Sequence, residues 1–308
     1  MVSAETASGT ARREFRDRLL DHGLLIATGV QGVYGRSAEF EDTVERIDLL
    51  VARTGGGDLA ERMRFPPVLN RAHFERSGYL KSFPHLAGTI HTFAGDDRAH
   101  RDLLHAVEES ADWSATFRAA PVVLVPAACY PVYPTLAGTL PRGGRLVDVM
   151  SYCFRHEPSD DAARMQMFRM HEHVRAAEPE AVVTWREVWL RRAEEMVQAL
   201  DIDGRAEAAS DPFFGRGGQL LAANQRDRGL KLEIVAPIAS RDAPAAIISL
   251  NYHQNYFGDL FGITTADGEA AHTACVGFGL ERIALALYYR HGLDRSHWAL
   301  PVRNVLGL

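Results

Sequence analysis

The chain has 308 residues, of which 46% are hydrophobic and 24% charged, and it carries a formal net charge of -6 at pH 7. This composition is that of a globular chain long enough to bury a sizeable core. The acidic balance argues against a protein that holds nucleic acid mainly by neutralising phosphates. No apolar run approaches the roughly 18 residues of a membrane span, and MVSAETASGTARREF lacks the basic-then-apolar layout of a signal peptide, so a cytoplasmic protein is expected.

The first third of the chain predicts one amphipathic helix, a boundary and an extended region. EFEDTVERIDLLVAR, residues 39–53, places apolar residues among charges, as a surface-packing helix does, and GGGD at 55–58 ends it. The paired prolines and alternation of RFPPVLNR (64–71) and SGYLKSFPHLAGTI (77–90) predict extended chain. A helix is expected over about 97–118, followed by a valine-rich strand and a loop in PVVLVPAACYPVY, residues 121–133.

The middle of the chain predicts an antiparallel hairpin. RLVDVMSYCFRHE (145–157) and RMQMFRMHEHV (164–174) have strand character, and the turn-rich PSDDAA lies between them. Further on, residues 184–200 and 281–292 predict helices, the second closed by Gly292, and 231–238 and 245–253 predict strands. Many adjacent strands with a hairpin among them indicate a mixed α/β (α+β) fold whose sheet is not purely parallel.

The hairpin carries groups that suit a nucleotide joined to a small acid. Side chains alternate along a strand, so Arg155 and Glu157 are expected on one face, and Phe168 and Glu172 on one face of the return strand. A guanidinium can fork onto phosphate, a carboxylate can accept from an exocyclic amine, and an aromatic ring can stack on a base. On spacing alone, a solvated hairpin with cross-strand ion pairs explains the same residues equally well.

Two histidines flank Glu172 in the triplet HEH. The triplet is not H-E-x-x-H, and on a strand His171 and His173 point away from Glu172. A metallohydrolase built on HEH is therefore disfavoured, and the histidines are expected to pack behind the hairpin.

The chain resembles the class II aminoacyl-tRNA synthetases at three motifs. Phe154-Arg155-x-Glu157, with Arg164 and Phe168 on the return strand, resembles motif 2. GFGLER at 277–282 resembles motif 3, and RFPPVLNR resembles motif 1 more loosely. A lone G-x-G-x-E-R would be weak evidence, but supporting segments follow in family order from about residue 30 to 285: GVYGRSAEFED, FPPVLNRAHFERSGYLKSFPHLAG, PAACYPVYP, ASDPFFGRGG, LKLEI, SLNYHQNYFG and ACVGFGLER. Most specifically, they resemble the amino acid:[carrier protein] ligases, small homologues of the archaeal-type seryl-tRNA synthetase catalytic core.

This resemblance implies a fold and an organisation. The fold would be a class II synthetase-like antiparallel sheet flanked by helices. Residues 1–308 would form a single catalytic domain with a short N-terminal helical extension, about 1–58, and no tRNA-binding domain. The family is dimeric through the motif 1 region, so a homodimer is expected.

The resemblance also implies an ATP site. Arg155 would contact the α-phosphate and act as the catalytic residue, stabilising the charge that develops there. Glu157 would read the adenine amine, Phe168 would stack on the ring, Arg164 would hold the outer phosphates with the Met165 backbone, and Arg282 would clamp from motif 3. Five further positions match nucleotide-lining residues: Lys231, Ala246, Ile247, Ile248 and Ser249. Mg²⁺ would accompany the phosphates, and no Walker-type G-x-x-x-x-G-K competes.

The resemblance changes the reading of the cysteines. Cys129, Cys153 and Cys275 are odd in number and far apart, so a disulfide framework is not expected, and spacing alone leaves small buried residues. In the resembled family Zn²⁺ is held by Cys, Glu and Cys, here Cys129, Glu172 and Cys275. The open fourth position would take the amino group of a substrate. Asp211, with Asn251 possible, would also bind that amine, His253 lies near the proposed site, and Cys153 has no matching role.

The implied reaction is activation of a small amino acid, glycine or alanine, by ATP, then transfer to the phosphopantetheine thiol of a carrier protein. About 60 residues precede motif 1, no sustained heptads occur and the chain is acidic, so tRNA is not the expected acceptor. Arg186, Arg191 and Arg192 on one predicted helix are a candidate face for the carrier protein, although charged helix faces are usually solvated. The alternatives are a truncated seryl-type enzyme charging tRNA and an inactive regulatory paralogue. Intact motif residues argue against the second.

Overall fold

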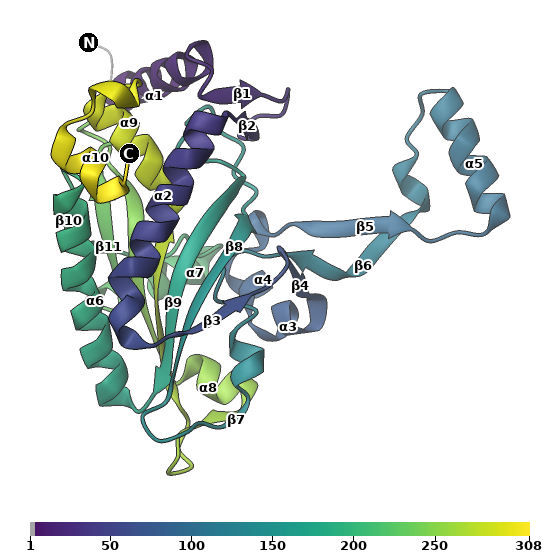
Figure 1. The fold of residues 1–308 in the computed structure, drawn as a ribbon. Coiled ribbons are helices and arrows are strands. Elements are labelled where there is room, and N and C mark those ends of the chain that lie inside the picture. Colours follow the sequence, from purple (N-terminus) through teal and green to yellow (C-terminus); the bar gives the residue numbers. More distant parts are fainter. Residues whose placement is uncertain (1–3) are drawn as a thin grey trace.

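A seven-stranded sheet forms the centre of the computed structural model, which describes residues 4–308 (Figure 1). Its strand order is β10-β11-β12-β14-β9-β8-β3. Neighbouring strands are antiparallel except β3, which pairs in parallel with β8. The strands are β3 (Glu61–Arg64), β8 (Arg145–Phe154), β9 (Met167–Ala177), β10 (Arg205–Ala208), β11 (Lys231–Ala236), β12 (Ala245–Gln254) and β14 (His272–Gly279).

Helices cover one face of this sheet: α2 (Ala38–Gly55), α6 (Pro179–Ala199) and α9 (Leu280–His291), with α1 (Ala4–Asp21) and α10 (Leu300–Leu306) beside them. Helix α2 begins where the Ser37 side chain accepts a hydrogen bond from the Phe40 amide. Phe40, Val44, Ile47 and Val51 then recur at helical spacing and are fully buried in the main core. The expected N-terminal helix therefore covers the central sheet itself.

A second apolar cluster covers the other face of the sheet, where short elements gather. They are β4 (Val68–Asn70), α3 (Arg71–Arg76), α4 (Tyr79–Ser82), α8 (Tyr256–Phe261), β7 (Gly138–Thr139) and β13 (Ile263–Thr264). The chain also forms a hairpin of β1 (Leu25–Ala27) and β2 (Tyr34–Arg36) and a helix, α7 (Arg216–Asp227).

An arm projects away from the body (Figure 1) and consists of β5 (Thr89–Phe93), α5 (Asp97–Glu108) and β6 (Phe117–Leu124). The helix expected over 97–118 is therefore wrong beyond Glu108. Ser110 adopts a positive φ of 54°, and the Asp112 side chain accepts from the Ser114 amide to form a turn. Phe117 then enters a strand that pairs with β5.

The extended chain expected over 77–90 is also wrong in part. Asn70 caps the short helix α3, accepting from the Ala72 amide, and Gly78 is left-handed with φ of 74°, after which Tyr79 starts α4. Extended structure resumes only at Thr89. The Asn70 cap and the left-handed Gly78 thus start short helices where the alternation of apolar and polar residues had predicted extended chain.

The expected hairpin, the helices expected over 184–200 and 281–292 and the strands expected over 231–238 and 245–253 are confirmed. The hairpin exists as β8 and β9, paired from Arg145↔Ala176 to Phe154↔Met167. Helices α6 and α9 and strands β11 and β12 lie where expected, and Gly292 follows α9 with φ of 95°. No helix among residues 4–308 combines the length and the hydropathy required to cross a membrane.

Candidate active site

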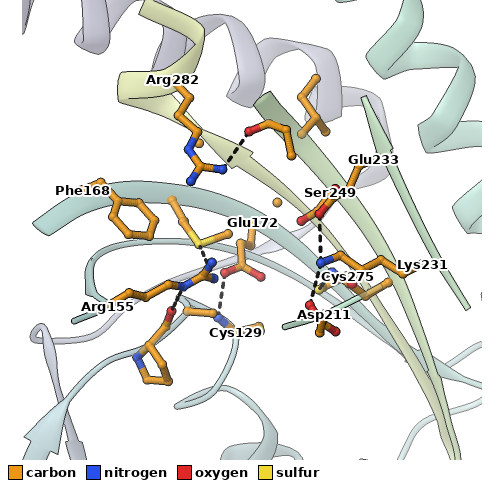
Figure 2. A pocket seen from close by; sticks show the side chains of 18 of the residues that line it. Cys129, Arg155, Phe168, Glu172, Asp211, Lys231, Glu233, Ser249, Cys275 and Arg282 are labelled. Carbon is orange, nitrogen blue, oxygen red and sulfur yellow. Dashed lines mark hydrogen bonds and ion pairs between the residues drawn. The ribbon is translucent and has the colours of Figure 1, made fainter. Parts of the chain in front are cut away.

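A pocket opens on the face of the sheet that carries Glu172, with the start of α9 at its edge, and most of the predicted site residues line it (Figure 2). It encloses about 1290 Å³ when its open mouth is included. The predicted residues that line it are Cys129, Arg155, Met165, Phe168, Glu172, Asp211, Lys231, Ala246, Ile247, Ile248, Ser249, Asn251, Cys275 and Arg282. Such a concave site with convergent polar groups is the usual setting of a small-molecule site.

Two predicted nucleotide residues, Glu157 and Arg164, do not line this pocket. The strand ends at Phe154, and the Glu157 amide donates to the Arg155 carbonyl, so the chain turns there. The expected strand alternation of Arg155 and Glu157 therefore does not hold. Glu157 and Arg164 form an ion pair of 3.2 Å with each other, and Arg164 is half exposed.

Strand alternation and register bring the central groups of the pocket together. On β9, Phe168, Met170 and Glu172 share the pocket face, and Gly277 of β14 lies opposite Glu172. A Cβ on Gly277 would lie 3.0 Å from Met170 Cε and 3.3 Å from Glu172 Cγ. Glycine at this position therefore keeps the space above the two side chains open.

Two arginines present their guanidinium groups to the pocket. Arg155 Nε donates to the Pro126 carbonyl at 3.3 Å, and its guanidinium carbon lies 5.4 Å from the Phe168 ring centroid. Arg282 donates to two carbonyls, that of Ala163 at 2.8 Å and that of Ala246 at 2.9 Å. In the described part of the chain neither group reaches a carboxylate at salt-bridge distance. The two are held by backbone and offer a preorganised site for an anion.

Burial changes the pKa of Arg282. Desolvation lowers the pKa of its guanidinium, and the nearby charges of Arg155 and Arg164 lower it further. A bound anion would relieve this repulsion.

A buried lysine and two carboxylates line the other side of the pocket (Figure 2). Lys231 Nζ lies 2.6 Å from Asp211 Oδ1 and 2.9 Å from Glu233 Oε1. Gln225 Nε2 donates to the other Asp211 oxygen at 2.8 Å. Glu233 and Gln225 were not foreseen, although Glu233 follows Lys231 by two residues on β11, so alternation in LKLEI could have indicated it.

The Asp211 cluster predicts an acid dependence of stability. Burial opposes ionisation of Asp211, but Lys231 and the Gln225 amide outweigh it and lower the pKa of this carboxyl. A lowered folded-state pKa contributes stability above the ordinary aspartate range, and this contribution disappears as the pH falls through the folded pKa. Urea unfolding of the native chain and Asp211→Asn between pH 7 and 3 should therefore show a stability gap that narrows with acid. A gap that widens with acid would contradict the assignment.

Cys129, Glu172 and Cys275 meet at the floor of the pocket. Their candidate ligand atoms all lie within 4.8 Å of one another, and all three residues are buried. Glu172 Oε1 accepts from the amides of Ala128 at 2.7 Å and Cys129 at 3.3 Å. Asn251 Nδ2 lies 3.5 Å from Cys275 Sγ.

The electrostatics of this cluster favour a cation. Burial, followed by the charge of Cys275, raises the pKa of Glu172 to about 8. A hydrogen bond from Cys129 lowers the pKa of Cys275 and raises that of Cys129 itself. Three acidic donors therefore share a desolvated space that a divalent cation would neutralise. Two sulfurs and a carboxylate oxygen are ligands that zinc accepts, so the residues fit the ion.

His253 lies at the pocket, as expected, and Cys153, for which no role was expected, does not line it. His253 lines the pocket, with Nε2 3.9 Å from Cys275 Sγ. Cys153 is fully buried in the second apolar cluster, as expected for a core residue.

The basic face expected on α6 is largely engaged in other contacts. Arg186 donates to the Gly229 carbonyl at 2.7 Å and lies over the Tyr252 ring. Arg192 forms a forked ion pair with Asp58. Arg191 alone of the three keeps an exposed side chain with no hydrogen bond or ion pair in the described part of the chain.

Solved structures show which class this fold belongs to. The seryl-tRNA synthetase of M. kandleri, solved with A. aeolicus tRNASec, superimposes with a TM-score of 0.80 at 20% identity, covering 95% of this chain and 60% of that one. The seryl-tRNA synthetase of Pyrococcus horikoshii complexed with ATP gives 0.67 at 17% identity, covering 96% and 62%. The chain thus spans about 60% of the length of these enzymes. Its fold is that of the class II aminoacyl-tRNA synthetases.

Sequence similarity narrows the class to a family. Amino acid–[acyl-carrier-protein] ligases 1 and 2 of Bradyrhizobium diazoefficiens are 45% and 44% identical, over 95% and 94% of this chain and 90% and 88% of theirs. The type-2 serine–tRNA ligase of Methanopyrus kandleri is 28% identical over 58% of this chain and 37% of its own length. The chain matches no protein-family model. It belongs to the amino acid–[acyl-carrier-protein] ligases.

Proposed function

We propose that the chain activates a small amino acid with ATP and transfers it to the phosphopantetheine thiol of a carrier protein. The observation that carries this proposal is that one pocket holds a buried Cys-Glu-Cys cluster together with two guanidinium groups that pair with no carboxylate among the described residues. The first suits phosphates and the second suits the amine of an amino acid. Family membership and the ATP complex of the Pyrococcus horikoshii enzyme support the same reaction.

In the first half-reaction an amino acid carboxylate oxygen would attack the α-phosphorus of ATP, and the bond to pyrophosphate would break. Arg155 would stabilise charge on the α-phosphate, Arg282 would bind phosphate beside it, and Phe168 would stack on the base. Mg²⁺ would accompany ATP and neutralise the phosphates. Glu157 and Arg164, as an ion pair beside the pocket, would contribute only after moving apart.

The floor of the pocket would select the substrate. Cys129, Glu172 and Cys275 would hold zinc, which when bound supplies an open position for the substrate α-amine. Asp211 and Asn251 line the same region and offer an acceptor and a polar group to that amine. Glycine or alanine is the proposed amino acid, since the family resemblance points to small side chains. In the second half-reaction the carrier thiol would attack the carbonyl of the adenylate, release AMP and lose its proton.

A two-acceptor assay tests the function. With ATP and each of the twenty amino acids, pyrophosphate exchange is expected only with small ones, glycine or alanine first. Labelled amino acid from the best substrate should then appear on a phosphopantetheinylated carrier protein and not on tRNA. The carrier protein without its prosthetic group is the control. Label on tRNA alone would favour a truncated seryl-type enzyme, and absence of any exchange would favour an inactive paralogue.

We also propose a homodimer of single catalytic domains located in the cytoplasm. The motif 1 resemblance supports the dimer. The arm adds to this support, because α5 buries none of its residues and leaves Leu104 and Val107 about half exposed. Light scattering at assay concentrations checks the mass, and a monomer would contradict the proposal.

A further inference from the structure

A second cluster of metal-binding side chains lies on the opposite face of the hairpin from the pocket. Asp148 of β8 and His171 and His173 of β9 point toward α2 and α6, where Asp48 and Trp189 meet them. Relative exposures are 6% for Asp148, 0% for His171 and 1% for His173. Glu172 lies between the two histidines in sequence. Because side chains alternate along a strand, its side chain points the other way, into the pocket.

The geometry of the cluster is that of a metal site. One ligand atom from each of Asp148, His171 and His173 lies within 4.8 Å of the others. His171 Nε2 is 3.4 Å from Asp148 Oδ1, too long for a strong hydrogen bond. Metal bonds of about 2.1 Å at a tetrahedral angle place two ligand atoms about 3.4 Å apart. The observed separation therefore suits an ion between the two atoms.

The hydrogen bonds around His171 support the same reading. Its Nδ1 lies 2.7 Å from Asp48 Oδ1 on α2, while its Nε2 makes no hydrogen bond of good geometry within the part of the chain that the structure describes. A carboxylate on one ring nitrogen is the usual arrangement behind a histidine that binds metal through the other nitrogen, because it fixes the tautomer.

The ion pairs of His171 with Asp48 and Asp148 do not explain why His173 is buried beside them. Among the described residues neither buried ring nitrogen makes a well-aligned hydrogen bond, although the Val51 backbone approaches the ring, and the ring stacks on Trp189 with centroids 4.3 Å apart. Gly55 makes room for it, since a Cβ there would lie 2.5 Å from His173 Cε1. A protonated His171 between Asp48 and Asp148 would satisfy the charges but leave His173 with no more than the poorly aligned contact to Val51, and buried polar groups are usually better paired.

We propose that Asp148, His171 and His173 bind a second divalent transition-metal ion, with zinc the best match to two imidazoles and one carboxylate. The charge of the ion would be balanced by Asp148 and Asp48, while Arg64 donates to Asp148 Oδ1 at 2.9 Å from the solvent side. Because Asp48 belongs to α2 and the ligands to β8 and β9, the ion would join α2 to the hairpin that carries part of the pocket.

Metal analysis in a chain without the pocket thiols tests this site independently of the proposed function. Full-length Cys129→Ala/Cys275→Ala, saturated with Zn²⁺ and then freed of loose metal, should retain one zinc per chain. With Co²⁺ it should show ligand-field absorption without a thiolate charge-transfer band, and added zinc should raise its unfolding temperature.

Two further substitutions, each made in that background, identify the ligands. Asp148→Asn keeps the side-chain shape and His173→Phe keeps the stacking on Trp189, and each should abolish zinc retention and the cobalt spectrum while circular dichroism stays native. Asp48→Asn should weaken zinc affinity by about 10- to 100-fold without abolishing it. Absence of bound zinc in the folded thiol-free chain, or equal retention after either ligand substitution, would overturn the proposal.

Discussion

Replacing Arg155 with alanine is expected to lower amino-acid-dependent pyrophosphate exchange by about 10²- to 10³-fold, the usual effect of removing one preorganised donor from a developing charge. The Arg155 guanidinium is aimed into the pocket by the Pro126 carbonyl and lies over Phe168. In the proposed role its interaction would strengthen as charge develops on the α-phosphate, so the loss should fall mainly on kcat. Exchange kinetics over a range of ATP and amino acid concentrations measure the two parameters.

Two companion variants give this experiment its controls. Arg155→Lys keeps the charge but removes the fork, and should recover only part of the rate. Arg290→Ala removes an arginine of the exposed Arg290–Asp201 ion pair, outside the pocket, and should leave exchange unchanged. If Arg155→Ala keeps native exchange, or loses it only through unfolding, the assigned role is wrong.

Replacing Cys275 with alanine is expected to remove zinc from the pocket and to raise the KM for the amino acid by at least about 100-fold, since losing even an outer-shell partner costs 10- to 100-fold. The physical reason is that the remaining pair, Cys129 and Glu172, would supply only two protein ligands. Metal content should fall by one zinc per chain relative to the native protein. The KM for ATP should change much less, because the substitution leaves Arg155 and Arg282 in place.

Cys153→Ala is the matched control for this change. Cys153 is also a buried cysteine, on the strand beside β9, but it does not line the pocket. It should keep the native zinc content and the native KM for the amino acid. Equal zinc in Cys275→Ala and the native chain would refute the pocket site.

The two faces of the hairpin of β8 and β9 carry different polar clusters. Phe168 and Glu172 point into the pocket, while His171 and His173 point toward α2 and Trp189. Both Glu172 and the histidines are buried, so strand alternation here separates two polar sites rather than a polar and an apolar surface. A substitution in the HEH triplet should therefore be assigned to one face before its effect is interpreted.

By itself, the sequence determined the features that depend on neighbouring residues. Alternation in residues 145–174 predicted the hairpin, and apolar spacing predicted α6 and α9 with Gly292 behind the latter. The order of short motifs predicted the class and family that similarity then confirmed. These signals are readable because period, capping and motif order are local properties of the chain.

Tertiary structure alone decided what depends on chain segments meeting in space. Cys129, Glu172 and Cys275 show no metal-site spacing in sequence. They converge because β9 pairs with β14 and because the loop after β6 brings Cys129 to Glu172. Glu157 left the expected face because the strand ended before it, and the helix expected over 97–118 stopped at Glu108. His171 and His173, expected only to pack, became candidate ligands because Asp148 and Asp48 come from other elements. Pairing, burial and register arise from the whole fold, so no window of sequence contains them.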